Sequence, residues 1–441
     1  MDIVQTVTTA LNHVLGTHLD EMARHCGVVL RQCKFTGQAL LRMLVVTLWH
    51  NPQASTADFL LTACQLGLDV SPTAIDKRLQ AGQPLVDFLR QALEHALQQT
   101  VASPPSDAQL LQPFAAVWLG DRTVIALPEE LADAFPGGGG QAAALKIQLL
   151  WNLKTGRIER LLLEPGRRSD ARSPIAVDQA EPGTLLVYDL GYFDVDRFAA
   201  LDRHQTRFVS RFLYGTTVYD AQGEPLDLVA YLRRQSAGLV DVPIQLGAAE
   251  RLRCRLIAVR VPPEVANRRR QQARNKARDH GRVASAAYLE LLGWTVFVTN
   301  SGAEELSWQA VVVLYRARWQ IELLFKLWKS HNGLAKFPSG AGALERLAVF
   351  YAKLLGVLLQ HWLLLATAWR LPQRSLVKAA KLLREELKGL LRALDDAKAL
   401  AQAVRCLQRL VQRLAQVQKR KKNPSHAQLL EAPELLDWLI A

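Results

Sequence analysis

The pattern of apolar residues changes twice along this chain, and that change constrains the fold more than any other feature. Residues 1–105 and the stretch after Gly340 have apolar residues at three- and four-residue steps, whereas the middle of the chain has short apolar runs separated by turn residues. The first pattern is typical of helices and the second of strands. The sequence therefore predicts an α/β protein, with a mixed sheet flanked by an N-terminal helical domain and by C-terminal helices.

The predicted sheet begins with an antiparallel ribbon. A strand is expected at 115–127 and a hairpin at 145–153 and 157–164, where two strand-like runs flank a glycine-containing turn. A ribbon followed by strand, helix and strand is typical of a mixed sheet. The elements expected after the ribbon are a helix at 169–180, a strand at 184–188, a helix at 194–202 and a strand at 206–212.

The stretch from 213 to 292 interrupts this pattern. It contains short strand-like pieces at 216–219, 228–232 and 252–261, and then a basic helix, before a strand resumes at 293–300. We interpret it as an insertion between a strand of the sheet and a later helix. The predicted domains are a helical domain at 1–105, a core at 106–212 and 293–340, a β-rich insertion with a basic helix at 213–292, and a C-terminal helical region at 341–441.

Two aspartates stand out in the predicted sheet. Asp121 interrupts the apolar run at 115–127, and Asp189 directly follows the apolar run at 184–188. Aspartate is depleted in strands, and a carboxylate within or just after an apolar strand usually marks a site at the end of that strand. Each aspartate alone is also explained as an edge or turn residue. Together, on neighbouring strands, they are candidates for a shared acidic site.

A third carboxylate lies on a helix predicted at 315–329, a stretch without Gly or Pro and rich in helix formers. Tyr315, Arg318, Glu322 and Lys329 lie at offsets 0, 3, 7 and 14. At about 100° per residue they fall within a sector of roughly 60°. A carboxylate can hold a divalent cation, and Arg and Lys on the same face suit a polyanion. The alternative is a solvated face with an i,i+4 Arg–Glu pair.

The net charge of +13 points to a polyanionic partner such as nucleic acid. Much of this charge lies in the basic helix, where seven cations fall within fifteen residues beside a single acid, Asp279. Such a helix attracts phosphate, although a charge run is often only a solvated face. We expect DNA-backbone contacts from it, and the basic run at 419–422 either touches phosphate or only aids solubility. The cations of the helix are Arg268, Arg269, Arg270, Arg274, Lys276, Arg278 and Arg282.

Two short helices in the N-terminal domain resemble a helix-turn-helix. One is expected after Ser55 and the other after Ser71, both good N-caps, with a glycine-containing connection between them. The second helix would present Thr73, Asp76, Lys77 and Arg78 to a DNA major groove. The alternative is a helical hairpin that serves only packing.

Several other classes of protein are disfavoured. The chain contains no Walker loop, HExxH, GxSxG or Rossmann fingerprint, and its five cysteines form no CxxC pair, which argues against a zinc site or a disulfide framework. No secretion signal is evident. The most apolar stretch, 347–371, is interrupted by Lys353, Gln360 and His361, so we expect a buried helix and no contact with a membrane. The expected compartment is the cytoplasm.

Three carboxylates that converge on one sheet edge suit two Mg²⁺ ions, for which Mn²⁺ can substitute. Such a pair of ions activates a water or a 3′-hydroxyl and stabilises the attacking and leaving oxygens at a phosphodiester. Asp121 would bridge the two ions, while Asp189 holds one of them and Glu322 the other.

These residues together resemble a known family. The spacing Tyr315-x2-Arg318-x3-Glu322-x6-Lys329 is similar to the YREK signature of the insertion-sequence-four family of bacterial DDE transposases. Asp121-Arg122-Thr123 and Asp189-Leu190-Gly191-Tyr192-Phe193 look like the first and second catalytic segments of that family. The resemblance covers residues 110–340 and is only architectural outside them.

The resemblance implies an RNase H-like core interrupted by a mainly β insertion, and cut-and-paste transposition that depends on Mg²⁺. The steps would be hydrolysis at the 3′ ends, hairpin formation, hairpin opening and strand transfer. Tyr315, Arg318 and Lys329 would hold phosphates of the strand that lacks the attacking hydroxyl. Trp294 is the candidate for stacking on a flipped base, the alternative being a core tryptophan. The partners would be transposon-end inverted repeats and target DNA, bound by a homodimer in a nucleoid-associated synaptic complex. The C-terminal helical region at 341–441 would be a candidate surface for that dimerisation.

Two other functions fit fewer of these features. One is a metal-dependent RNase H-like nuclease that cuts and never joins, and the cations that suit a retained DNA end argue against it. The other is an inactive DNA-binding regulator derived from a transposase, and the intact acidic triad argues against that.

Overall fold

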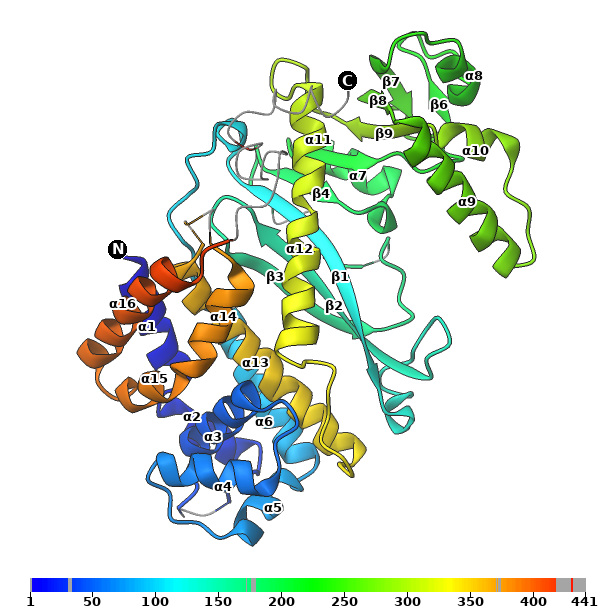
Figure 1. Cartoon of the computed structure of the whole chain (residues 1–441). Coiled ribbons are helices and arrows are strands. Elements are labelled where there is room, and N and C mark those ends of the chain that lie inside the picture. Colours follow the sequence, from blue (N-terminus) through cyan, green and yellow to red (C-terminus); the bar gives the residue numbers. More distant parts are fainter. Residues whose placement is uncertain are drawn as a thin grey trace.

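The described strands form one nine-stranded mixed sheet in the order β3-β2-β1-β4-β5-β9-β8-β7-β6. The structure, a computed structural model, describes residues 2–30, 34–171, 173–175, 180–369, 371, 374–417 and 430. Figure 1 shows helices from both ends of the chain gathered beside one end of this sheet. One long helix, formed by α11 (Trp308–Ala317) and α12 (Trp319–Lys326), crosses the sheet. The predicted α/β class, a mixed sheet flanked by helices, is confirmed.

The first five strands form the half of the sheet that carries the acidic residues. β1 pairs with β2 antiparallel, and β2 with β3, so the predicted antiparallel ribbon is confirmed. β1 pairs with β4, and β4 with β5, in parallel. The parallel pair β4 and β5 arises because the helix after β4 returns the chain to the same end of the sheet. These elements are β1 (Val117–Leu127), β2 (Ala143–Asn152), β3 (Ile158–Pro165), β4 (Leu185–Tyr188), α7 (Val195–Arg203) and β5 (Arg207–Arg211).

The insertion extends the same sheet. β9 pairs with β5 on one side and with β8 on the other, so the inserted strands continue the sheet in space although they interrupt it in sequence. The insertion is also more helical than predicted. Its elements are β6 (Val218–Tyr219), α8 (Leu228–Arg233), β7 (Leu239–Leu246), β8 (Leu252–Arg260), α9 (Pro263–Asp279) and α10 (Ala286–Leu291), followed by β9 (Trp294–Thr299).

Two local predictions were wrong. The strand expected at 228–232 is helix α8, which Asp227 caps by accepting a hydrogen bond from the backbone N–H of Ala230. The helix expected at 169–180 is absent from the described part of that stretch. There the side chain of Asp170 is held by a buried lysine, and Pro174 disfavours helical continuation.

Helices from the two ends of the chain share one hydrophobic cluster. α13 (Ala343–Thr367) packs against α3 (Gly37–His50) and α6 (Gln83–Leu97), and α16 (Ala397–Leu414) packs against α1 (Ile3–Val14). The predicted domain boundaries stay a prediction, but these helices form their core jointly. The remaining described helices are α2 (His18–His25), α4 (Thr56–Gln65), α5 (Pro72–Leu79), α14 (Leu376–Glu385) and α15 (Leu387–Ala393). The basic run at 419–422 lies outside the described residues.

α13 is the one helix in the described ranges that is long and apolar enough to cross a membrane, and its most apolar stretch is entirely buried inside the protein. The predicted buried helix is therefore confirmed. The polar residues of α13 have partners inside the protein. Lys353 donates to the carbonyl of Gly333, and His361 and Gln360 make hydrogen bonds with backbone and side-chain groups of neighbouring elements.

His361 connects α13 to the β2–β3 turn. Its Nε2 lies 2.7 Å from the carbonyl oxygen of Gly156, which also accepts a hydrogen bond from Nε1 of Trp151 at 2.9 Å. Burial lowers the pKa of His361 to about 4, from an ordinary value of 6.5. The folded state therefore resists protonation of this ring, so its contribution to stability is complete above pH 6.5 and is lost as the pH falls towards 4.

We expect His361→Gln, which cannot be protonated in this range, to remove part of the acid sensitivity of the fold. Between pH 7 and pH 4 the wild type should lose about 3 kcal/mol more unfolding free energy than the variant, from 1.36 kcal/mol per pKa unit. Urea unfolding at both pH values measures this difference. The exposed His280 provides the matched control His280→Gln, which should leave the acid sensitivity unchanged. Equal losses in wild type and His361→Gln would contradict the assignment.

Candidate active site

The helix predicted at 315–329 is present, and it changes character near its end. α11 (Trp308–Ala317) is capped by the side chain of Ser307, and α12 (Trp319–Lys326) continues it through Arg318, whose backbone is also helical. The last segment, Leu327–His331, is a π-helical turn. Such turns are rare and often lie at functional sites. Because a π turn holds more residues than an α turn, Lys329 is rotated from the position that a regular helix would give it.

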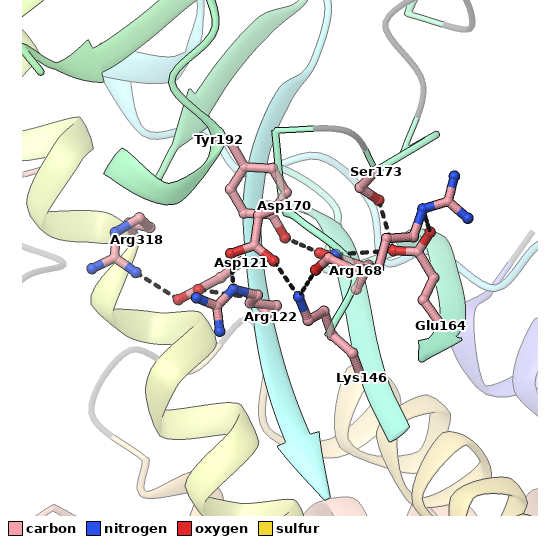
Figure 2. A network of polar contacts seen from close by, with 10 residues as sticks. Asp121, Arg122, Lys146, Glu164, Arg168, Asp170, Ser173, Tyr192 and Arg318 are labelled. Carbon is pink, nitrogen blue, oxygen red and sulfur yellow. Dashed lines mark hydrogen bonds and ion pairs between the residues drawn. The ribbon is translucent and has the colours of Figure 1, made fainter. Parts of the chain in front are cut away.

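Arg318 brings the three predicted carboxylates together. Its Nη1 lies 2.5 Å from Oδ2 of Asp121, a contact visible in Figure 2, and its Nη2 lies 2.7 Å from Oε1 of Glu322. The same Nη2 lies 3.7 Å from Oδ1 of Asp189, which also accepts a long hydrogen bond of 3.5 Å from the hydroxyl of Tyr315. Residues 121, 189 and 322 come from β1, from the end of β4 and from α12, so the predicted convergence is observed.

Burial governs the electrostatics of this cluster. The pKa of Asp121 is raised to about 6, first by burial and further by the charges of Asp189 and Glu322, although Arg318 opposes the shift. Burial alone would lower the pKa of Arg318, but the surrounding carboxylates outweigh it and hold that pKa above its usual range. Burial and Asp189 raise the pKa of Tyr315 to about 12, so its hydroxyl remains a neutral hydrogen-bond donor.

A buried polar network lies behind the cluster, on the other face of the sheet (Figure 2). Successive side chains of a strand point to opposite faces, so Arg122 lies opposite Asp121. The carboxylate of Asp170 forms ion pairs with Arg122 and with Lys146, the latter at 2.7 Å. The network continues at Gln148, whose side chain contacts Tyr192 and donates a hydrogen bond to Glu164 at 3.1 Å. Glu164 also accepts a hydrogen bond from Ser173 at 3.0 Å and forms an ion pair with Arg168 at 3.1 Å.

This network fixes the backbone that presents two of the acids. The N–H of Arg122 donates to Oδ1 of Asp121 at 2.8 Å, and Tyr192 ends the short turn that follows Asp189. A Cβ atom at Gly191 would lie 3.0 Å from Oδ2 of Asp170, so this turn packs closely on the network. Both oxygens of Asp170 are bound by cations, so it supports the site and is not one of its free carboxylates. This network was not predicted. The sequence signal that could have indicated it is the presence of polar residues at alternate positions of β2.

The basic helix α9 is confirmed, but its cations differ in what they do. Arg269 donates to the carbonyl of Trp294 at 3.3 Å and to the hydroxyl of Thr295 at 3.0 Å, and Arg270 donates to the carbonyl of Leu289 at 3.0 Å. These two hold α9 against β9 and α10. Arg274 is exposed and makes no hydrogen bond or ion pair with any residue that the structure describes. The other exposed cations of this stretch are Arg268, Lys276, Arg278 and Arg282.

The side chain of Trp294 is largely covered in this structure. Only 7% of the residue is exposed, and the guanidinium of Arg260 lies 4.5 Å from the centre of its ring. Stacking on a flipped base would require this guanidinium to leave the ring. The proposed stacking role stays a prediction, and the observed environment is that of the core tryptophan named as its alternative.

The two short N-terminal helices begin where predicted. Ser55 forms a capping box with Asp58 at the start of α4, and Ser71 caps α5. Lys77 is exposed, whereas Arg78 donates to the carbonyl of Val28 at 2.6 Å and so serves packing here. Their role in reading DNA stays a prediction.

Two large apolar side chains near the acids were not predicted as part of the site. Trp319 and Leu323 are 56% and 42% exposed on the helix that carries Glu322. They lie one turn apart, so they form an apolar strip beside the acidic face. The sequence signal was their spacing of four residues next to Arg318 and Glu322. Lys329 is half-buried, and its amine has no hydrogen-bond or ion-pair partner among the described residues.

The chemistry of the acidic cluster fits a divalent metal. Carboxylate oxygens are the ligands that Mg²⁺ and Mn²⁺ prefer, and the three acids already surround one cationic group, the Arg318 guanidinium. As the side chains stand, the part of the chain that the structure describes contains no group of three or more acidic, His or Cys residues arranged to hold a metal. Metal binding would therefore require Arg318 to withdraw from the carboxylates.

Comparison with known proteins agrees with this geometry. The family model for the transposase DDE domain matches residues 114–353, which is more than half of the chain and includes all three carboxylates. This match indicates a DNA-processing enzyme. The chain belongs to the DDE transposase family, and membership implies the use of a divalent metal.

Curated relatives are transposases of insertion sequences. The transposase of IS231F from Bacillus thuringiensis subsp. israelensis is 28% identical over 345 residues, which cover 72% of this chain and 71% of the relative. The transposase of IS1151 from Clostridium perfringens is 26% identical over 311 residues, covering 65% and 64%. InsL of the insertion sequence element IS186A from Escherichia coli (strain K12) is 35% identical over a shorter stretch of 117 residues, which cover 25% of this chain and 32% of the relative.

Proposed function

We propose that this protein is the transposase of a bacterial insertion sequence, of the insertion-sequence-four family with its YREK signature. The observation that carries the proposal is the convergence of Asp121, Asp189 and Glu322 on Arg318. Those three acids come from two parallel strands and a helix that crosses them, as an RNase H-like core requires. The strand order β3-β2-β1-β4-β5, with β2 antiparallel, supports that designation of the core.

Asp121, Asp189 and Glu322 would hold two Mg²⁺ ions, or Mn²⁺ in their place. When bound, such ions supply activation of the attacking hydroxyl and stabilisation of charge at the phosphodiester. Asp121 is the acid best placed to be shared, because it is the most buried of the three and its strand, β1, contacts both β4 and α12. The buried network around Asp170 keeps β1 and the Asp189 turn in place while the charges at the site change.

The other polar residues on the helix face that carries Glu322 would hold DNA. Arg318, once released from Asp121 and Glu322, presents a planar guanidinium that suits a phosphate. Tyr315 donates a hydrogen bond as a neutral hydroxyl, and Lys329 adds a cation that no described residue neutralises. Together they would hold the strand that lacks the attacking hydroxyl. Hairpin formation requires that strand to remain close after the first cut.

Cut-and-paste transposition follows from these roles. Hydrolysis would free each 3′ end, the 3′-hydroxyl would attack the opposite strand to form a hairpin, and the opened end would join target DNA. A homodimer would bring two inverted-repeat ends together in a synaptic complex in the cytoplasm, at the nucleoid. Exposed Lys77 on α5 and Arg274 on α9 would add contacts to the DNA backbone.

A Mg²⁺ assay on a duplex that carries the terminal inverted repeats of the element tests this function. The repeats are read from the DNA that flanks the gene. We expect hairpin ends and strand-transfer products with Mg²⁺, and none when EDTA is present. Cleavage without any joined product would instead identify a nuclease. DNA binding without cleavage would identify an inactive regulator.

A further inference from the structure

A second cationic cavity borders the acidic site. It has a volume of about 360 Å³ and lies where β5, β8, β9, α9 and α11 meet. Tyr315 belongs to both places, because it lines this cavity while its hydroxyl reaches Asp189. No aspartate or glutamate is among the described residues that line the cavity. Its charged lining consists of Arg211, Arg260, Arg269 and Arg316.

Two of these arginines are fixed by the protein. Arg260 donates to the carbonyl of Gln235 at 2.6 Å and lies over the ring of Trp294. Arg269 donates to Trp294 and Thr295, as described above. Their charges therefore stay at the wall of the cavity whether or not a ligand is present. Neither has an acidic partner within the part of the chain that the structure describes.

The other two arginines have no side-chain partner among the described residues. Arg211, at the end of β5, has a buried Nε without a hydrogen-bond acceptor, and its guanidinium makes no ion pair with the described residues. Arg316, on α11, is exposed and equally lacks a partner among those residues. An unsatisfied buried donor on a charged group costs free energy, so its retention needs an explanation.

The four charges also repel one another. Burial, and then the charge of Arg211, lowers the pKa of Arg269. Such a group of like charges is unfavourable in the free protein and is relieved by an anion. A phosphodiester oxygen pair matches the paired N–H groups of a guanidinium, which makes phosphate the anion that this lining suits.

We propose that this cavity binds one phosphate of the DNA backbone, adjacent to the phosphate held at the acidic site. The inference rests on the proposed function, because it supplies a second contact for the DNA strand at Tyr315. It also gives the insertion a role, since Arg260 and Arg269 come from β8 and α9. The insertion thereby builds half of a DNA-binding cavity beside residues of the core.

The test uses Arg211→Ala, Arg316→Ala and the double variant, with the full-length protein and the end duplex, without divalent metal. The double variant should bind about tenfold more weakly, and the slope of log affinity against log salt should fall in magnitude by about one, as for the loss of one phosphate contact. The exposed Arg253 on β8 provides the control, since Arg253→Ala removes one positive charge outside the cavity, as each single variant does inside it. The side chains of Arg211 and Arg316 make no hydrogen bond with the described residues, and they place like charges close together, so thermal stability should not fall.

A matched change in the DNA identifies the phosphate. Duplexes with a single neutral methylphosphonate near the transposon end are compared one by one. At one position the substitution should weaken wild-type binding about tenfold but leave the double variant unaffected, because both changes remove the same contact. If the double variant behaves like Arg253→Ala with every duplex, the proposal fails. That failure is distinct from failure of the transposase function, which the strand-transfer assay of the wild type decides separately.

Discussion

Glu322→Gln is expected to reduce end cleavage and strand transfer by roughly a thousandfold, equivalent to about 4 kcal/mol in activation free energy. Glutamine has nearly the same shape, and its amide oxygen can still accept the hydrogen bond from Arg318 that spans 2.7 Å in the wild type. The helix and its packing are therefore preserved. What is lost is one of the three negative charges that would hold the divalent ions.

The binding of DNA separates this effect from a general loss of function. In the absence of metal, Glu322→Gln should bind the end duplex as tightly as the wild type, because the cations on the same helix face remain. Glu304, which is exposed on the loop before α11, provides the control Glu304→Gln, with unchanged cleavage and joining expected. Strand transfer that persists in Glu322→Gln would show that the acidic triad has been assigned incorrectly.

The local part of the site was predictable because it depends on helical geometry. Arg318 and Glu322 are four residues apart, so any helix through them places both side chains on one face, and the observed 2.7 Å contact follows. The strand assignment of Asp121 was equally local, since the apolar residues around it define β1. The mixed sheet was predicted from an antiparallel ribbon followed by strand, helix and strand, and the parallel pair β4 and β5 agrees with that succession.

The long-range part of the site was not predictable from local pattern. The contact of Arg318 with Asp121 joins residues 197 positions apart, and it exists because α11 and α12 pack across β1 and β4. Periodicity placed Arg318 among the groups that hold DNA, but nothing in it indicated that the free protein uses this guanidinium to neutralise three acids. The same holds for Arg269 and Arg270, whose charges looked available in sequence and are engaged by backbone carbonyls.

Removal of Arg318 has the second large expected effect. Its side chain is 13% exposed and that of Asp121 is 10% exposed, so Arg318→Ala leaves a buried carboxylate without its cation. Losing one partner of a buried pair costs about 3 kcal/mol, and we expect a lower melting temperature in metal-free buffer. Mn²⁺ should restore most of this loss, because a divalent cation can neutralise the same acids.

Arg318→Ala should at the same time bind divalent metal more tightly and transpose less. In the wild type the guanidinium occupies the space between the carboxylates, so a metal must displace it, and without this competitor the Mn²⁺ concentration at half-saturation should fall about tenfold. Strand transfer should nevertheless decrease, since the same guanidinium is proposed to hold a phosphate once it is released. Calorimetric titration with Mn²⁺ measures the metal affinity, and the joining assay measures strand transfer. Arg318→Lys keeps the charge without the planar guanidinium. Its metal affinity and its strand-transfer activity should both lie between those of the wild type and Arg318→Ala. Weaker metal binding in Arg318→Ala would mean that Arg318 organises the carboxylates for the metal and does not compete with it.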